Sequence, residues 1–309
     1  MLLASIAMSA AMLSPTLGVG QEAPATAAAE APIRLEDLAV QGTRRRPLID
    51  RFVANVAQPS TNRQVARWRR GDQFCVGVMN MPQATSQYVA DRIGDVARGL
   101  ELRVGAPGCT PNVFMIAADQ SNAGNEWLRT NLRPVLMRNE SGTTAGRRAY
   151  DRFVENPAPV RWWHISYVTS IHNDTGIPGD PIIDRALQGV RKSHQTASRI
   201  LTGDADYLRT VFIVFDPTRL THLTTNQLAD YLAFLSLAQV NTEADTEAYD
   251  SILNVVAHPN EVAGLTDWDK AYLQGLYSAQ RTQRIAGAAR DEIANSIERQ
   301  ARLMAATVE

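Results

Sequence analysis

Histidine, carboxylate and hydroxyl side chains are the groups from which acid–base or metal chemistry could be built in this chain of 309 residues. Its five histidines are His164, His172, His194, His222 and His258. None lies four residues from another, so no two of them can bind zinc from one face of a helix. The chain also lacks the GxSxG, HExxH, GxGxxG and EF-hand patterns and the phosphate-binding loop. The common signatures of hydrolases and nucleotide-binding proteins are therefore missing.

Two histidines remain as candidates for a catalytic or binding role. His164 alternates with tryptophan and serine on an expected strand, where a hydrogen-bonded structural histidine is the commoner outcome. His172 is followed by Asn-Asp-Thr-Gly, a sequence that also forms turns. A hydrolase that pairs either histidine with a carboxylate such as Asp174 is the alternative that the sequence leaves open.

Apolar runs and helical periodicity predict the elements that position these side chains. Short apolar runs bounded by Gly, Asp or Pro indicate strands, and apolar residues spaced by three and four indicate helices. The order of elements predicts an α+β fold: a small mixed sheet with a backing helix and a long helix after the last strand, followed by a helical C-terminal subdomain. The expected strands are 74–79, 112–118, 160–169 and 211–215, and the expected helices are 86–100, 125–132, 224–240, 248–256, 266–279 and 281–304.

Changes in composition predict how the chain is divided. Residues 1–20 are uncharged, largely apolar and end in Gly-Val-Gly, which predicts a signal peptide without the usual positive start; an N-terminal core helix is the other interpretation. Residues 21–40 begin with an Ala/Pro/Glu-rich run typical of a disordered linker. We expect a sheet subdomain at 41–223 with a long polar insertion at 170–207, and a helical subdomain at 224–309.

Charge and cysteine content limit the compartment and the partners. With 31 basic and 32 acidic residues and 45% hydrophobic residues, the chain is neither disordered overall nor suited to nucleic acid. No apolar run reaches the roughly 18 residues that span a bilayer, so no transmembrane anchor is expected. In an exported chain Cys75 and Cys109 would form one disulfide, with two separate thiols as the alternative. These features predict a periplasmic or secreted protein.

The stretch from 44 to 70 is strongly basic, with eight arginines and a single acid, Asp50. A nucleic-acid site would normally interleave several aromatic residues for stacking on bases. We therefore interpret the stretch as a solvated surface, or as arginines that pair with acids elsewhere in the chain.

The segment 224–254 (TTNQLADYLAFLSLAQVNTEADTEAYDSILN) resembles a family of secreted bacterial zincin-like domains without an established function. In that family a helix starts with an HExxQ- or HExxH-like motif and is followed by Tyr-Asp-Ser-Ile, which stands here at 249–252. The pattern Leu-Thr-x-x-Asp and Leu-x-x-Leu-Tyr at 265–277 is similar to the family's C-terminal helix. The resemblance covers about residues 50–280 and implies a metallopeptidase-type fold.

The metal-binding signature of that family is degenerate in this chain. Asn226 and Gln227 stand where the family has His-Glu, and Asp230 stands one turn later. A glutamine cannot accept a proton from zinc-bound water, and an asparagine amide is a poor zinc ligand. The resemblance therefore implies a catalytically inactive module, without metal or cofactor, that binds a peptide or an envelope protein in the former substrate cleft. A purely structural envelope component is a further alternative.

The same residues also have a structural interpretation. Thr224 and Gln227 have the spacing of a capping box at the start of a helix. The apolar residues that follow would form the buried stripe of that helix. The two interpretations are compatible.

Overall fold

The computed structural model describes a large part of the chain. It divides the chain into two compact units, Met1–Ala31 and Pro32–Glu309, and every element named below belongs to the second. That unit spans both of the predicted subdomains. The signal peptide predicted at 1–20 lies outside the described residues, and His172 does too. The described residues are 31–35, 45–58, 64–118, 125–126, 128–133, 146–171, 203–281 and 286–306.

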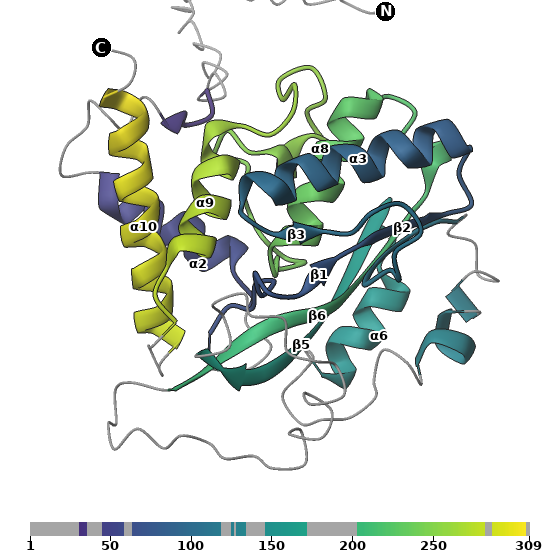
Figure 1. Cartoon of the computed structure of the whole chain (residues 1–309). Helices are drawn as coiled ribbons and strands as arrows, with labels where there is room; N and C mark the ends of the chain where they lie inside the picture. Colours follow the sequence, from purple (N-terminus) through teal and green to yellow (C-terminus); the bar gives the residue numbers. More distant parts are fainter. Residues whose placement is uncertain are drawn as a thin grey trace, which may run out of the picture. The chain divides into compact units, whose positions relative to one another are not determined.

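Four strands form a mixed sheet in the order β2-β4-β6-β5 (Figure 1). β2, β4 and β6 are parallel, and β5 runs antiparallel to β6 at the edge of the sheet. The predicted α+β class is confirmed at the level of a small mixed sheet with several helices. The strands are β1 (Gln73–Phe74), β2 (Val76–Met79), β3 (Arg103–Val104), β4 (Val113–Ala117), β5 (Val160–Ser170) and β6 (Asp204–Phe215), with β1 and β3 forming a separate parallel pair.

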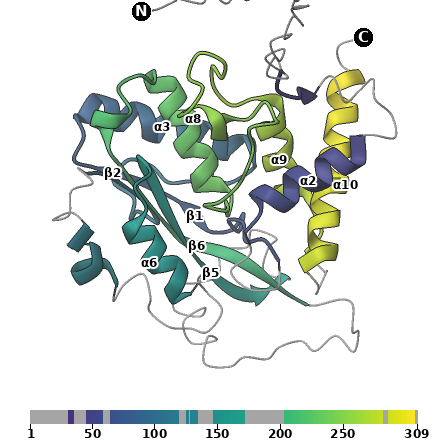
Figure 2. The same cartoon turned by 180° about the vertical axis from the view of Figure 1, so that it is seen from behind.

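Helices cover both faces of the sheet (Figures 1 and 2). α3 and α8 lie side by side on one face, within the larger hydrophobic cluster, and α6 packs on the other face in a smaller one. α10 packs against α2 and α9. The helices are α2 (Arg45–Val56), α3 (Gln83–Gly99), α6 (Arg147–Glu155), α8 (Thr225–Leu237), α9 (Asp267–Ser278) and α10 (Ala286–Ala306), with short turns η2 (Leu128–Leu132), η4 (Pro217–Arg219) and η5 (Ile252–Asn254).

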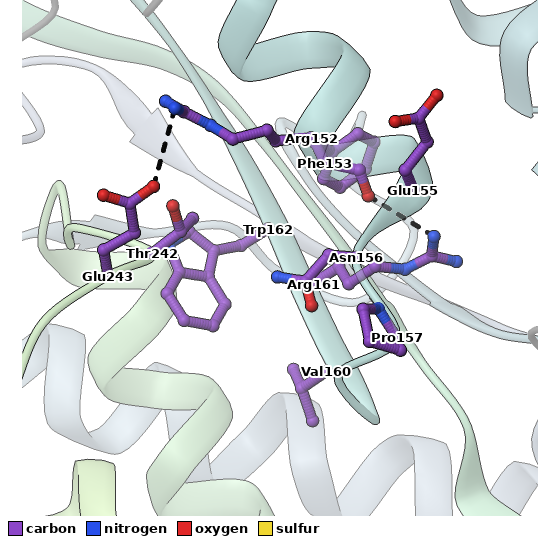
Figure 3. Close-up of a pocket in the computed structure, with 10 residues that line it drawn as sticks. All are labelled: Arg152, Phe153, Glu155, Asn156, Pro157, Val160, Arg161, Trp162, Thr242 and Glu243. Atoms are coloured by element: carbon purple, nitrogen blue, oxygen red, sulfur yellow. Dashed lines mark hydrogen bonds and ion pairs between the residues drawn. The ribbon is translucent and has the colours of Figure 1, made fainter.

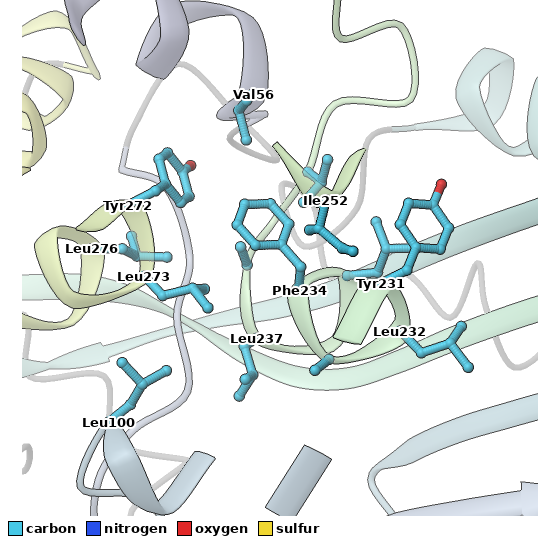
Figure 4. Packing of buried hydrophobic residues seen from close by; sticks show 14 of the residues in the cluster. Val56, Leu100, Tyr231, Leu232, Phe234, Leu237, Ile252, Tyr272, Leu273 and Leu276 are labelled. Carbon is cyan, nitrogen blue, oxygen red and sulfur yellow. The ribbon is translucent and has the colours of Figure 1, made fainter. Parts of the chain in front are cut away.

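The larger core is centred on α8, in which every residue from Gln227 to Leu237 is buried. A helix that is apolar around most of its circumference must be covered on all sides. Figure 4 shows Phe234 of α8 facing Tyr272 of α9, and their ring centroids are 5.7 Å apart. α8 is therefore held by the sheet, by α3 and by α9 together.

Several predicted elements were wrong. Instead of the helix expected at 248–256 there is a turn and η5, because the Asn254 side chain binds backbone oxygens of Thr246 and Tyr249 and so favours a turn over a helix. The helices α2 and α6 were not predicted. In the helix expected at 125–132, residues 125–126 are α-helical and Leu128–Leu132 form the π-helix η2. β6 starts at Asp204, so the last residues of the predicted insertion 170–207 belong to the sheet.

Two arginines of the basic stretch are buried rather than solvated, and for Arg69 the other interpretation, pairing with an acid outside the stretch, is confirmed. Arg67 is buried and donates hydrogen bonds to the backbone oxygens of Leu276, Tyr277 and Ala279 at the end of α9. Arg69 is also buried and pairs with Asp72. Neither side chain forms part of an open basic surface.

The N-terminal edge of the second unit is attached to the core. Ile33, in the predicted linker 21–40, forms a β-bridge with Tyr249, and its carbonyl accepts a hydrogen bond of 2.8 Å from the Trp268 indole. Leu35 is buried. These residues of the predicted linker are therefore packed against the helical part.

The predicted disulfide is confirmed. Cys75, between β1 and β2, is bonded to Cys109 in the segment that leads to β4. Their Cα atoms are 6.1 Å apart, within the usual range for a disulfide. Within the described residues, no helix has the length and apolar character needed to cross a bilayer.

Candidate functional site

The first turn of α8 is built by the predicted capping box. The Thr224 hydroxyl accepts from the Gln227 backbone N–H at 3.2 Å, and the Gln227 side-chain oxygen accepts from the Thr224 backbone N–H at 2.9 Å. The other end of the Gln227 amide donates to the carbonyls of Pro259 and Val262 at 2.6 and 2.7 Å. The amide oxygen of Gln227 therefore holds the start of the helix, and its amide nitrogen holds the segment before α9.

Asp230 lies one turn later and is 1% exposed. Its carboxylate binds Arg92 of α3 through two contacts, Nε–Oδ1 at 2.6 Å and Nη2–Oδ2 at 3.1 Å. Its Oδ2 also accepts from the Leu265 backbone N–H at 2.9 Å. Only a glycine fits at Gly264, because a Cβ there would lie 2.5 Å from Oδ2 of Asp230. The hydrogen bond to Asp230 raises the pKa of Arg92.

Asn226 is half-buried beside this ion pair. Its Oδ1 lies 3.4 Å from the Tyr88 hydroxyl of α3, and its Nδ2 lies 3.5 Å from the Ala263 carbonyl. The structure thus brings Asn226, Gln227 and Asp230 together, at the junction of α3, α8 and the segment 259–265. Asn226 and Asp230 face the backing helix α3, whereas the Gln227 side chain binds the segment 259–265.

His164 lies elsewhere, at the contact of β5 with the second half of α8. Its Nε2 is 2.9 Å from the Leu235 carbonyl oxygen and the side chain is buried. Burial lowers the pKa of His164 to about 4. The imidazole is therefore neutral at pH 7, and its Nε2–H donates to Leu235. Among the described residues, no group of three or more His, Cys, Asp or Glu side chains is arranged to hold a metal ion.

A cavity of about 290 Å³ lies beside the first residues of β5 (Figure 3), and neither Asn226 nor Asp230 lines it. Its lining mixes apolar, charged and amide side chains. The Trp162 ring forms part of the wall and is fixed by a hydrogen bond of 2.9 Å from its indole N–H to the Val240 carbonyl. The lining residues are Arg152, Phe153, Glu155, Asn156, Pro157, Val160, Arg161, Trp162, Thr242 and Glu243.

The cavity lies at the outer edge of the sheet. Trp162 packs against the cluster on the α8 face, whereas Trp163 belongs to the cluster on the α6 face, as the alternation in the sequence predicted. Arg152 of α6 and Glu243, which follows α8, form an ion pair of 3.5 Å. Because α6 and α8 lie on opposite faces of the sheet, this ion pair passes around the edge strand β5.

Comparison of the chain with family models, with curated proteins and with solved structures found no match.

The cavity was missed by the sequence analysis. Its walls come from α6, which was not predicted, from β5, and from a segment about 80 residues further along the chain. One local signal was available: Arg161 stands inside the apolar run VRWWHISYV. A charged residue at an inward-facing strand position needs a binding partner, either within the fold or in a ligand.

Proposed function

We propose that this chain is an exported, non-catalytic binding module of the bacterial cell envelope, and that it binds an extended peptide segment along the outer edge of β5. The observation that carries the proposal is the cavity beside that edge. β5 pairs with β6 alone among the described strands of its sheet. Peptides commonly bind as an added strand at such an edge, with side-chain pockets next to it for specificity.

The contacts at the start of α8 support the non-catalytic part of the proposal. A metal ion at Asp230 would have to displace Arg92 and the Leu265 N–H from a buried carboxylate. Gln227 is equally committed, since both ends of its amide are used. His164 is a weak base at neutral pH and its Nε2 is held by Leu235. These side chains stabilise the fold in ways that catalysis would interrupt.

The order of elements supports a zincin-like ancestry as part of the same proposal. A backing helix, α3, a helix after the last strand, α8, and the helical part beyond it follow the layout that the resemblance implies. On this proposal the former ligand positions now join α8 to α3, and the binding surface is the neighbouring strand edge.

A selection experiment tests the binding function. Dodecapeptides are selected from a random display library on the purified protein, and hydrogen exchange then locates the backbone that a selected peptide protects. We expect protection in β5 (Val160–Ser170), because an added strand engages the amides of the edge. Protection confined to other elements would contradict the proposal, and cleavage of the bound peptide would favour a hydrolase.

A matched pair of variants places the peptide at the cavity. Thr242 is exposed at its wall, so Thr242→Trp fills the cavity without disturbing the core. Thr225→Trp makes the same change at an exposed position at the start of α8, outside the cavity. We expect Thr242→Trp to weaken binding by about ten-fold or more and Thr225→Trp by less than about two-fold. Equal effects would exclude the cavity as the binding site.

A further inference from the structure

Arg161 is a buried cation in the cavity wall for which the described residues supply no carboxylate. Its side chain is 2% exposed. Among the described residues, its hydrogen bonds all come from Nη1, which donates to the Asn125 side chain at 2.9 Å and to the carbonyls of Phe153 and Val154 at 3.3 and 2.6 Å. These acceptors are neutral. Buried charges are normally paired with an opposite charge, so the guanidinium is an exception to be explained.

The acidic side chains of the cavity are engaged by other arginines. Glu155 pairs with Arg129 at 2.7 Å, and Glu243 pairs with Arg152 at 3.5 Å. Arg161 is therefore the charged residue of the lining that is left without an ion pair among the described residues. The carbonyls at the C-terminal end of α6 offset part of this charge through the helix dipole, but they carry no full negative charge.

One nitrogen of the Arg161 guanidinium group, Nε, is buried without a hydrogen-bond acceptor among the described residues. Figure 3 shows the side chain crossing between Phe153 and Pro157, with Trp162 on the other side of the cavity. A carboxylate characteristically binds an arginine through two parallel N–H···O bonds. The aromatic and aliphatic lining would accept an apolar group beside it.

We propose that the cavity binds a carboxylate of the peptide ligand together with a neighbouring apolar side chain, and that Arg161 is the anion-binding residue. The inference rests on the proposed function and specifies its ligand. The carboxylate comes either from the C-terminus of the peptide or from an aspartate or glutamate side chain. Both sources present the same two oxygens to the guanidinium.

Small probes with matched charge test the inference by NMR titration of the full chain. N-acetyl-phenylalanine carries a terminal carboxylate, and N-acetyl-aspartyl-phenylalaninamide carries a side-chain carboxylate. Their neutral matches are N-acetyl-phenylalaninamide and N-acetyl-asparaginyl-phenylalaninamide. We expect at least one acid to bind about ten-fold more tightly than its match, because a charge-assisted hydrogen bond replaces a neutral one. The acid that binds identifies the source of the carboxylate.

The side-chain Nε–H resonance of Arg161 gives a direct readout in the unaltered protein. We expect the acid, and not its neutral match, to shift this resonance. Equal binding of acids and amides, an unmoved Arg161 resonance, or no binding of any of the four probes would each overturn the inference.

Variants supply the second readout. Arg161→Gln should remove the preference for the acid, whereas Arg148→Gln, the same change at an exposed position of α6 outside the cavity, should retain it. If Arg161→Gln does not fold, the shift of the Arg161 Nε–H resonance in the wild type decides whether this residue binds the carboxylate. The two proposals fail separately. Peptides that protect β5 without any charge preference would overturn the role of Arg161 alone, and acid binding without protection of β5 would overturn the added strand alone.

Discussion

Arg92 of α3 and Asp230 of α8 face each other through two short contacts, of 2.6 and 3.1 Å, and so join the two helices that cover one face of the sheet. The carboxylate is buried and the guanidinium is partly exposed. Charge-assisted, two-point contacts of this kind fix orientation as well as distance. The position where a metal ligand was expected from the zincin-like resemblance thus has an arginine as its structural partner.

Replacing Asp230 by alanine is expected to destabilise the fold by about 2–3 kcal/mol, because it leaves Arg92 and the Leu265 N–H without their acceptor. The measurement is the free energy of unfolding in urea. Asp95→Ala is the control, since Asp95 pairs with Arg98 at the surface, where such a pair contributes about 0–1 kcal/mol. Equal losses in the two variants would mean that the Arg92–Asp230 pair does not hold the helices together.

Metal analysis of the purified protein tests whether Asp230 is part of a zinc site. We expect the purified protein to bind no zinc in stoichiometric amount, because the carboxylate of Asp230 is engaged by Arg92 and the Gln227 amide is used at both ends. The zinc content is measured for the wild type, for Asn226→Ala and for Asp230→Ala. Stoichiometric zinc that is lost in either variant would overturn the non-catalytic proposal.

Local signals in the sequence were sufficient for some features and not for others. The capping box of Thr224 and Gln227 was predicted because its contacts lie within four residues of each other. The disulfide followed from there being two cysteines in a chain interpreted as exported. Short apolar runs placed β2, β4 and β5 to within a few residues.

Features that depend on distant partners were not predictable in this way. The partner of Asp230 lies 138 residues before it, and nothing in the local pattern marks Arg92. The burial of Arg67 depends on the carbonyls that end α9, about 210 residues later in the chain. Trp162 and Glu243 meet at one cavity only after the sheet and α8 have packed. Such sites are set by tertiary packing rather than by local propensity.

His164 should make the free energy of unfolding depend on pH, with lower stability in acid. Burial lowers its pKa from 6.5 to about 4, so the folded state binds the proton more weakly than the unfolded state does. The contribution is therefore complete above pH 6.5 and is lost as the pH falls toward 4, up to about 3 kcal/mol for one buried group. Unfolding free energies at pH 7 and pH 4.5 measure it. His164→Gln retains a donor for Leu235 and should remove this part of the pH dependence; an unchanged profile would show that His164 is not its source.

Asp269 should give a pH dependence of the opposite sign. Burial raises its pKa from 3.8 to about 6, although Ser251, Thr266 and the Ile252 N–H all donate to its carboxylate and lower it. Since the folded state binds this proton more tightly, the contribution to stability is complete below about pH 4 and is lost as the pH rises through 6.

The variant Asp269→Asn isolates this group. It loses some hydrogen bonds at every pH, but it should no longer lose stability between pH 4 and pH 7, whereas the wild type loses up to about 3 kcal/mol from this site. Both proteins are measured on the His164→Gln background, which removes the opposing titration of His164. The two sites share no hydrogen-bond partner, since His164 contacts Leu235 and Asp269 contacts Ser251, so their effects on stability should add. A wild-type slope that survives Asp269→Asn would show that the Asp269 carboxylate is not its source, despite the four donors that contact this side chain.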